Sequence, residues 1–389
     1  MSFLFLLSFL ASACFSPTPG TTISGYVYVD KNNNGVRDKN EVGVKGVIIS
    51  DQVTTTISDD EGYYQFESKN NLGSIFVTQP TGYAIKGLFW KLIPKNQTEF
   101  KCDFALNIIA AASKFTFIHA SDTHLSEISV NRIQKLRQKS DSIKVAFVLI
   151  SGDLIKDALR VPEKEASRLY ELYVTEINKF SVPVYSVPGN HEVFGIERHN
   201  SLVSSNNPLY GKGMYRSYLG PDYYSFNYGG IHFMGINSVD YHDLWYYGHV
   251  DSLQLAWMKQ DISSISKSMP VVTFNHIPFF SGGLSMWGYQ DEEPGSTLLS
   301  INGEKIYRHV VDNSIDIMSV FKNNFFALAL SGHYHASQQF MIEGVKTRFN
   351  QTGAIINPSG LGDIVLPSGF TVYSVENGKI DNGKFVEIR

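Results

Sequence analysis

Five short polar motifs, each placed directly after an apolar run, constrain the fold of this chain more than any other feature. The runs are rich in β-branched and aromatic residues, and such runs bounded by turn residues are typical of buried strands. Polar side chains at the carboxyl ends of strands in an open α/β sheet meet along one edge. The sequence therefore predicts one site built from distant residues: Asp122 and His124, Asp153, Asn190 and His191, His276, and finally His333 and His335.

The side chains in these motifs are donors for metal ions. Imidazole, carboxylate and amide oxygen without thiolate suit divalent zinc, manganese or iron. One carboxylate can bridge two ions that lie about 3.5–4 Å apart, as in two-metal hydrolytic sites. One such motif alone is more often a turn or a core residue than a ligand. Five in succession, each at the end of a strand, indicate a centre for two metal ions.

The order of the motifs resembles the calcineurin-like metallophosphoesterase superfamily, whose pattern is Asp-x-His, Gly-Asp, Gly-Asn-His-Asp/Glu, His and Gly-His-x-His. Residues 114–389 contain every part of it. The resemblance implies an α/β (α+β, four-layer) fold with two mixed β-sheets flanked by helices and the metals at the sheet edge. It also implies ligands for one metal at Asp122, His124 and His335, ligands for the other at Asn190, His276 and His333, and a bridging Asp153.

His191 resembles the catalytic histidine of that superfamily, which lies beside the metals without binding them. Histidine is the usual proton donor near neutral pH, so His191 is expected to protonate the leaving group or to stabilise the transition state. Glu192 is either a hydrogen-bonding partner of His191 or an exposed carboxylate. Purple acid phosphatases have glycine and tyrosine where this chain has His124 and Lys156, so a purple iron(III) centre is disfavoured.

The expected function is hydrolysis of a phosphomonoester or phosphodiester, with a shared water activated by both ions attacking phosphorus in line. The alternative is an adhesin-like surface protein whose phosphoesterase fold is a non-catalytic binding module. A third interpretation, a calcium-dependent spacer, leaves residues 114–389 unexplained. The presence of every ligand position together with His191 favours the enzyme.

A calcium loop is predicted near the N-terminus, after an alternating strand at residues 23–29. Counted from Asp30, oxygen-bearing side chains stand at positions 1, 3, 5, 9 and 12, with Gly35 at position 6. This is the spacing of calcium loops, in which position 7 contributes its backbone carbonyl. The alternative is a hairpin turn rich in Asn and Asp. The predicted calcium ligands are Asp30, Asn32, Asn34, Val36, Asp38 and Glu41.

The length of 389 residues predicts two domains. Residues 21–110 resemble the B-type β-sandwich repeats of bacterial surface adhesins and the N-terminal domain of some secreted metallophosphoesterases, and residues 111–389 form the phosphoesterase domain. The first domain is expected to act as a rigid spacer or as a prop beside the catalytic domain. The net charge of −4 argues against non-specific binding of nucleic acid, which requires a basic surface.

Residues 1–20 are predicted to be a signal peptide, because the apolar run at residues 3–10 is too short to span a bilayer. The following Leu-Ala-Ser-Ala-Cys14 resembles a bacterial lipoprotein cleavage box, which would place a lipid anchor on Cys14 and the protein in the cell envelope. Ordinary secretion and an uncleaved start are the alternatives, because Ala11 replaces the preferred leucine and no Lys or Arg precedes the apolar run.

Aromatic residues that follow His276 suggest a substrate pocket, because aromatic faces stack on bases, sugars or lipid headgroups. Trp287 and Tyr289 are the predicted substrate contacts. Arg198 and Arg216 follow the Gly-Asn-His-Glu motif closely enough to reach a phosphate, although a surface position is the simpler expectation. His309 has no spacing that connects it with the site.

Overall fold

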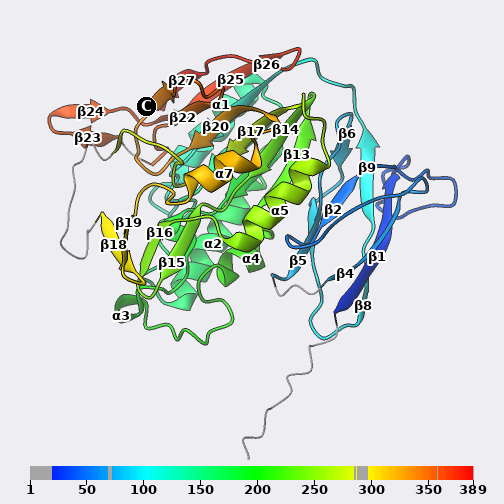
Figure 1. The fold of residues 1–389 in the computed structure, drawn as a ribbon, viewed down its shortest axis with the longest axis horizontal. Coiled ribbons are helices and arrows are strands. Elements are labelled where there is room, and N and C mark those ends of the chain that lie inside the picture. Colours follow the sequence, from blue (N-terminus) through cyan, green and yellow to red (C-terminus); the bar gives the residue numbers. More distant parts are fainter. Residues whose placement is uncertain (1–19, 69–71, 284–285, 287–296, 357, 389) are drawn as a thin grey trace, which may run out of the picture.

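The computed structural model describes residues 20–68, 72–283, 286, 297–356 and 358–388. Figure 1 shows a small β domain packed beside a larger α/β domain. The predicted signal peptide with Cys14, and the predicted substrate contacts Trp287 and Tyr289, lie outside the described residues. Among the helices that are described, none is long and apolar enough to cross a bilayer.

The first domain consists of two sheets that face each other across a small core. In one sheet β1 (Thr21–Val29) is antiparallel to β4 (Tyr63–Ser68) and parallel to β8 (Glu99–Lys101) and β9 (Phe104–Ile108), and β9 pairs with β6 (Tyr83–Ile85). The other sheet has the order β3 (Thr55–Ile57), β2 (Ile48–Ser50), β5 (Ser74–Val77) and β7 (Trp90–Leu92). Alternate residues of β1, including Ile23 and Val27, point into the core, as a half-buried strand requires.

The first sheet of the α/β domain carries three of the polar motifs. Its order is β12 (Val184–Val187), β11 (Phe147–Ser151), β10 (Lys114–Ala120), β25 (Gly369–Glu376) and β26 (Lys379–Ile380), with β27 (Lys384–Glu387) also on β25. Strands β10, β11 and β12 are parallel, and β25 is antiparallel to β10. Apolar side chains of α1 (Val130–Ile143), α2 (Glu163–Ile177) and α4 (Gly213–Leu219) pack against one face of this sheet.

The second sheet of this domain carries the other two motifs. Its order is β13 (Tyr224–Tyr228), β14 (Ile231–Gly235), β17 (Pro270–Phe274), β20 (Phe325–Ser331), β22 (Arg348–Gln351) and β21 (Gln338–Met341). The four strands from β14 to β22 are parallel, and β13 and β21 are antiparallel edges. Helices α5 (Ser252–Ser263) and α7 (Ser314–Val320) cover its outer face.

The two sheets pack face to face through aromatic residues. Phe147 and Phe117 of the first sheet contact Phe233 of the second, with ring centres 5.1 and 5.5 Å apart. Helix, sheet, sheet and helix therefore form four layers, and the predicted metallophosphoesterase fold is confirmed. Shorter elements complete the domain: α3 (Arg198–Ser201) and the hairpins β15 (Val239–His242)–β16 (Trp245–Gly248), β18 (Leu298–Ile301)–β19 (Glu304–Tyr307) and β23 (Ser359–Leu361)–β24 (Ile364–Leu366).

The two domains share a hydrophobic interface. Phe76 of β5 belongs to the core of the α/β domain, where its ring meets Trp257 of α5 edge to face at 6.1 Å. Trp90 of β7 packs so closely on Gly220 that a Cβ atom there would lie 2.2 Å from the indole ring. Gln52 reaches across to donate a hydrogen bond of 2.9 Å to buried Asp222. The first domain therefore packs as a buttress against the α/β domain.

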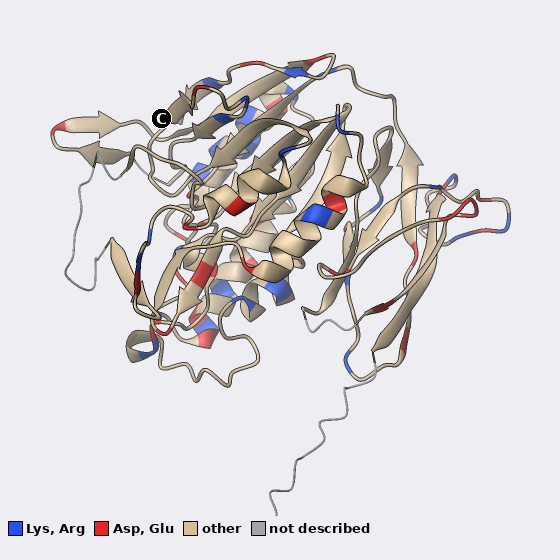
Figure 2. Cartoon of the chain, in the orientation of Figure 1, with Lys and Arg blue, Asp and Glu red and all other residues tan. Residues whose placement is uncertain are grey.

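Charged residues are spread over both domains. Figure 2 shows blue and red segments scattered over the helices, loops and outer strands of both domains, whereas the central strands of the α/β domain are tan, and neither sign gathers in one region. This distribution accompanies the small net charge of −4.

Candidate metal centre

All five polar motifs meet at one edge of the paired sheets. Asp122 and His124 follow β10, Asp153 follows β11, and Asn190 and His191 form a short 3-10 turn after β12. His276 follows β17, and His333 and His335 follow β20. The structure thus brings together the eight residues that the sequence predicted for the metal centre. The reason is topological, because parallel strands place their carboxyl ends at the same edge.

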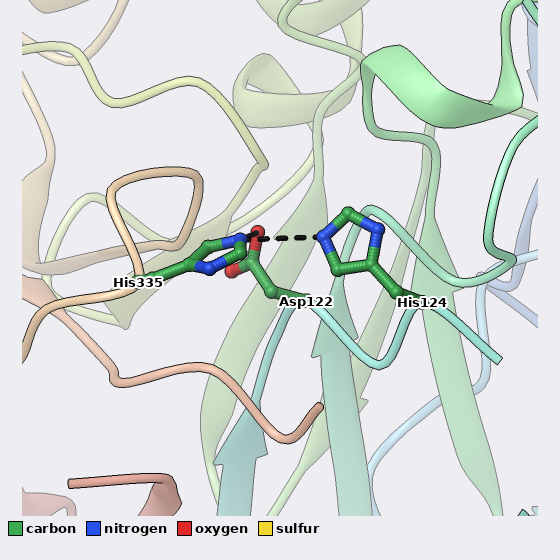
Figure 3. Close-up of side chains that lie close together, drawn as sticks. All are labelled: Asp122, His124 and His335. Atoms are coloured by element: carbon green, nitrogen blue, oxygen red, sulfur yellow. Dashed lines mark hydrogen bonds and ion pairs between the residues drawn. The ribbon is translucent and has the colours of Figure 1, made fainter. Parts of the chain in front are cut away.

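Two groups of potential ligands lie side by side. In the first, Nε2 of His335 lies 3.3 Å from Oδ1 of Asp122 and 3.2 Å from Nε2 of His124 (Figure 3). In the second, Nε2 of His276 lies 3.0 Å from Oδ1 of Asn190 and 3.1 Å from Nδ1 of His333. Within each group the donor atoms are close enough to hold one ion, with Asp153 completing the second.

Asp153 connects the two groups. Its Oδ1 is 3.2 Å from Nε2 of His276, and its Oδ2 is 3.5 Å from Nε2 of His124. Each oxygen of one carboxylate therefore faces a different group of donors. This is the placement that a bridging ligand requires.

The donor atoms of the centre are better suited to bind divalent metal ions than to form hydrogen bonds with one another. Oδ1 of Asp122 is buried and has no hydrogen bond of good geometry, although it lies close to His335. The facing ring nitrogens of His276 and His333 are 3.1 Å apart, with the ring planes inclined at 78°, and those of His124 and His335 are 3.2 Å apart, with the planes inclined at 61°. Imidazole nitrogen with carboxylate and amide oxygen is the donor set that zinc, manganese and iron(II) accept.

Neighbouring charges prepare these groups for a cation. Burial opposes ionisation of Asp153, but the nearby histidines, His276 first, hold its pKa well below the usual value. Burial lowers the pKa of His124 to about 4, whereas at His276 the Asp153 carboxylate outweighs burial and raises the pKa to about 9. Because only the neutral imidazole binds a metal, an ion held by His276 would displace a proton from it.

The backbone of the centre is strained. Asp122, His124, Asp153, His333 and His335 all have positive φ, between 38° and 74°. Side chains other than glycine rarely adopt this left-handed conformation, which costs about 1–3 kcal/mol per residue and is concentrated at functional sites. Hydrogen bonds between the loops hold it in place, including those from Asp122 N to Gly152 O at 3.0 Å and from His333 N to Asp122 Oδ2 at 3.1 Å.

More than half of the chain, residues 115–337, matches the family described as calcineurin-like phosphoesterase. The chain belongs to this family. Residues 31–108 match the domain described as the N terminal of calcineurin-like phosphoesterase. Both resemblances expected for the phosphoesterase and its N-terminal domain are thereby confirmed.

Two curated relatives resemble the first domain of this phosphoesterase. Serine-aspartate repeat-containing protein D of Staphylococcus aureus strain Newman is 39% identical over 73 residues, which are 17% of this chain and 6% of that protein. Serine-aspartate repeat-containing protein F of Staphylococcus epidermidis is 35% identical over 60 residues, 14% of this chain and 4% of that protein. The chain spans only a small fraction of either relative, and the resemblance to the adhesin repeats is distant.

Two solved structures with a similar chain fold, at low sequence identity, are a phosphatase and a membrane-complex anchor. A dimetal phosphatase from Danio rerio is 15% identical, with a TM-score of 0.45 over 67% of this chain and 93% of that one. GAP50, the anchor in the inner membrane complex of Plasmodium, is 14% identical, with a TM-score of 0.43 over 70% of this chain and 84% of that one. Membership of the phosphoesterase family rests on the sequence match and on the site, not on these similarities.

His191 lies at the rim of the phosphoesterase centre. Its Nδ1 is 2.6 Å from the carbonyl oxygen of Lys156, so Nδ1 carries the proton of this hydrogen bond. Its Nε2 consequently faces the centre, 3.9 Å from Oδ2 of Asp153, and its ring packs edge to face on His124. Geometry alone also allows His191 to share an ion with His124 and Asp153.

Glu192 is neither a partner of His191 nor an exposed carboxylate, the two roles expected from the sequence. It is buried and does not pair with His191. Its carboxylate instead accepts hydrogen bonds from the backbone N–H groups of Leu154, Ile155 and Gly189 at 2.6–3.0 Å. It therefore ties the loop of Asp153 to the loop of Asn190. Burial, with a contribution from Asp153, raises the pKa of Glu192 to about 8.

Two arginines considered as phosphate contacts are used elsewhere. Arg216 forms a bidentate pair with Asp222, with both N–O distances at 2.9 Å, and Arg198 pairs with Asp243 and Tyr210. His309, which no spacing implicated, contacts His333 at 2.8 Å. No sequence pattern pointed to His309, because its segment follows none of the strands that carry the predicted ligands.

A cavity of about 720 Å³ opens beside the segment that follows His276. Phe279, Phe280, Tyr307, Val310 and Phe340 contribute apolar surface, and Gln338 adds an amide. No charged side chain is found among its described lining residues.

The predicted calcium ligands form a compact loop in the first domain. Oδ2 of Asp30 accepts a hydrogen bond from Gly35 N at 2.8 Å, and both oxygens of Glu41 accept from the loop backbone. The amides of Asn32 and Asn34 donate to Asp38. The side chain of Val36 is exposed, and the ammonium group of Lys86 lies 3.3 Å from Asp30.

Proposed function

We propose that this phosphoesterase hydrolyses a phosphomonoester or a phosphodiester at a centre of two divalent ions. The observation that carries the proposal is the position of Asp153, which turns one oxygen to each group of donors. Asp122, His124 and His335 would hold one ion, and Asn190, His276 and His333 the other. The ions, when bound, would act as Lewis acids on a phosphate oxygen and acidify a shared water.

The protein's own contribution is charge, orientation and a proton route. The buried carboxylates of Asp122 and Asp153 provide the negative charge that retains cations. The bond from His191 to the carbonyl of Lys156 fixes the ring so that Nε2 faces the centre. When the ring is doubly protonated, Nε2 is therefore the atom from which a proton would pass to the leaving oxygen, a role that typically contributes about 10²–10⁴-fold to the rate.

The test is turnover of bis-p-nitrophenyl phosphate and p-nitrophenyl phosphate by protein loaded with manganese or zinc. Asp153→Asn should abolish turnover, and His191→Ala should lower kcat by at least about 100-fold. His242→Ala, at an exposed position on β15, is the control and should be unaffected. Wild type that binds both ions but hydrolyses no phosphoester in a broad panel would instead favour the adhesin-like binding module.

We also propose that the loop from Asp30 to Glu41 binds calcium. The support is its ligand spacing together with the hydrogen bond from Gly35 N to Asp30, which places a glycine at the turn. Calcium should raise the melting temperature of the protein, and Asp30→Ala should remove the increase. Asp60→Ala is the matched control, because Asp60 is exposed outside the loop and forms an ion pair with the exposed Lys45. Equal melting curves with calcium and with chelator would reject the site.

We further propose export to the cell envelope with a lipid on Cys14. The support is the apolar run at residues 3–10 and the Leu-Ala-Ser-Ala-Cys box that follows it. In a bacterial host the full chain should fractionate with membranes, and Cys14→Ser should release it. Equal fractionation of both forms would contradict the anchor.

A further inference from the structure

His309 touches the metal centre from a segment that carries none of the five motifs. Its Nδ1 lies 2.8 Å from Nε2 of His333. The other ring nitrogen of His333, Nδ1, lies 3.1 Å from Nε2 of His276. His333 therefore turns one nitrogen toward the centre and the other toward His309.

The relation between these two rings differs from that between histidines that face a common ion. The rings of His309 and His333 are inclined at only 24°, with centres 5.0 Å apart. Because the nitrogens are 2.8 Å apart, about 1.1 Å of the distance between the ring centres remains for each ring. This equals the distance from the centre of an imidazole ring to its atoms, so both nitrogens lie on the line that joins the two ring centres. The rings are thus nearly coplanar and end to end, as in a straight hydrogen bond, whereas His276 and His333 cross at 78°.

The direction of this hydrogen bond follows from the role of His333. A metal ligand must offer a lone pair, so Nδ1 of His333 carries no proton and Nε2 of the neutral ring must carry one. Nε2–H of His333 then donates to Nδ1 of His309. In the same way, the carbonyl of Ser151 receives the N–H of His276, at 2.9 Å from Nδ1.

The ring of His309 is held in place by strand β16. Gly248 N donates to Arg308 O at 3.1 Å, and Asp312 N donates to Gly248 O at 3.0 Å. A Cβ atom on Gly248 would lie 2.4 Å from the carbonyl oxygen of Val310, so the approach depends on glycine. The ring of Tyr246 meets that of His309 edge to face at 5.9 Å.

We propose that His309 is a positioning residue of the second metal site, which accepts the Nε2–H of His333 and so fixes the tautomer and orientation of that ligand. The proposal rests on the two-metal centre proposed above. Partners of this kind around a metal ligand typically account for about 10–100-fold in metal affinity. Because His309 contacts His333 and not the first group of donors, its loss affects one ion and spares the other.

The experiment is titration of chelator-treated protein with Zn²⁺ and, separately, Mn²⁺, followed by calorimetry and by the electron paramagnetic resonance of Mn²⁺. His309→Ala should retain one ion at wild-type affinity and bind the other about 10–100-fold more weakly. His309→Asn should stay within about threefold of wild type, because Oδ1 of asparagine can stand where Nδ1 accepts the bond. His309→Gln carries its oxygen one bond further out and should behave like the alanine variant. His242→Asn is the control.

Each outcome decides the proposal. Two ions bound by His309→Ala at wild-type affinity would overturn it, and so would an asparagine variant as weak as the alanine variant, because packing of the ring would then explain the effect. If His309→Ala does not fold, the difference between the asparagine and glutamine variants decides. Affinity is measured without substrate, so a failure here is distinct from a failure of phosphoester hydrolysis, and wild type that binds no second ion would reject both.

Discussion

Replacement of Asp222 by asparagine tests whether one buried ion pair holds the domain junction together. The carboxylate is fully buried, and each of its oxygens accepts two hydrogen bonds. Oδ1 receives Nε of Arg216 and Nε2 of Gln52, and Oδ2 receives a second nitrogen of Arg216 and Nδ2 of Asn237, all at 2.8–2.9 Å. In either orientation the amide of asparagine would therefore turn its NH₂ group toward two donors.

The expected loss of stability is large. Breaking a buried pair by removal of one charge leaves the guanidinium of Arg216 uncompensated, which typically costs about 3–5 kcal/mol. Burial opposes ionisation of Asp222, but Arg216 outweighs it and lowers the pKa from 3.8 to about 2. This depressed pKa contributes about 2 kcal/mol to the free energy of unfolding. The contribution is fully present above pH 5 and is lost as the pH falls through 3.8 toward 2.

Equilibrium unfolding in urea at pH 7, 5 and 3 measures both effects. Asp222→Asn should lower the free energy of unfolding by about 3–5 kcal/mol at pH 7. At pH 3 the difference in this free energy between wild type and variant should be smaller by about 1 kcal/mol. Gln52→Ala removes only the donor from the first domain and should cost about 1 kcal/mol. A variant as stable as wild type at pH 7, or a difference that does not change with pH, would refute the reasoning.

Three further predictions concern packing and the metals. Phe76→Ala should cost about 3–5 kcal/mol and destabilise both domains together, because the ring fills the core of the α/β domain; separate thermal transitions with an unchanged upper one would contradict this. Gly332→Ala should weaken metal binding in a Zn²⁺ titration, since a Cβ atom there would lie 1.8 Å from Ser121 Oγ and 2.6 Å from Asp122 Oδ2, whereas Gly360→Ala, with nothing closer than 3.7 Å, should bind as wild type does. In calcium-free buffer, removal of Zn²⁺ by a chelator should lower the melting temperature of wild type but not of Asp153→Asn, because an ion at 100 times its dissociation constant stabilises the folded state by about 2.7 kcal/mol.

The candidate centre was predictable because its residues follow strands. A polar residue such as Asp153 or His276 after a buried run has its position set by the sheet, so motif order is sufficient to gather the ligands. The division into a β domain and an α/β domain was visible in the same way, from alternating runs before residue 110 and apolar runs after it. Local patterns thus contain the parts of the fold that local geometry determines.

The remaining features depend on contacts between distant segments. Glu192 binds three N–H groups on two loops, and nothing in its neighbourhood in the sequence shows where those loops run. His309 is positioned by pairing with Gly248, and Phe76 reads as a residue of its own β domain although it fills the core of the other. Nothing in the sequence indicates that Arg216 pairs with Asp222. Charged side chains are expected at the surface, and these two are shielded from solvent only where the first domain covers them.

The left-handed backbone at five of the predicted ligands limits which metals this scaffold can be made to select. Aspartate and histidine are among the few residue types besides glycine that tolerate positive φ, and they are also the donors used here. A change to cysteine for a softer ion, or to glutamate for a harder one, would add the conformational cost of the new residue to any gain in coordination. Engineering of ion preference is therefore better directed at Asn190 and His276, which do not have positive φ.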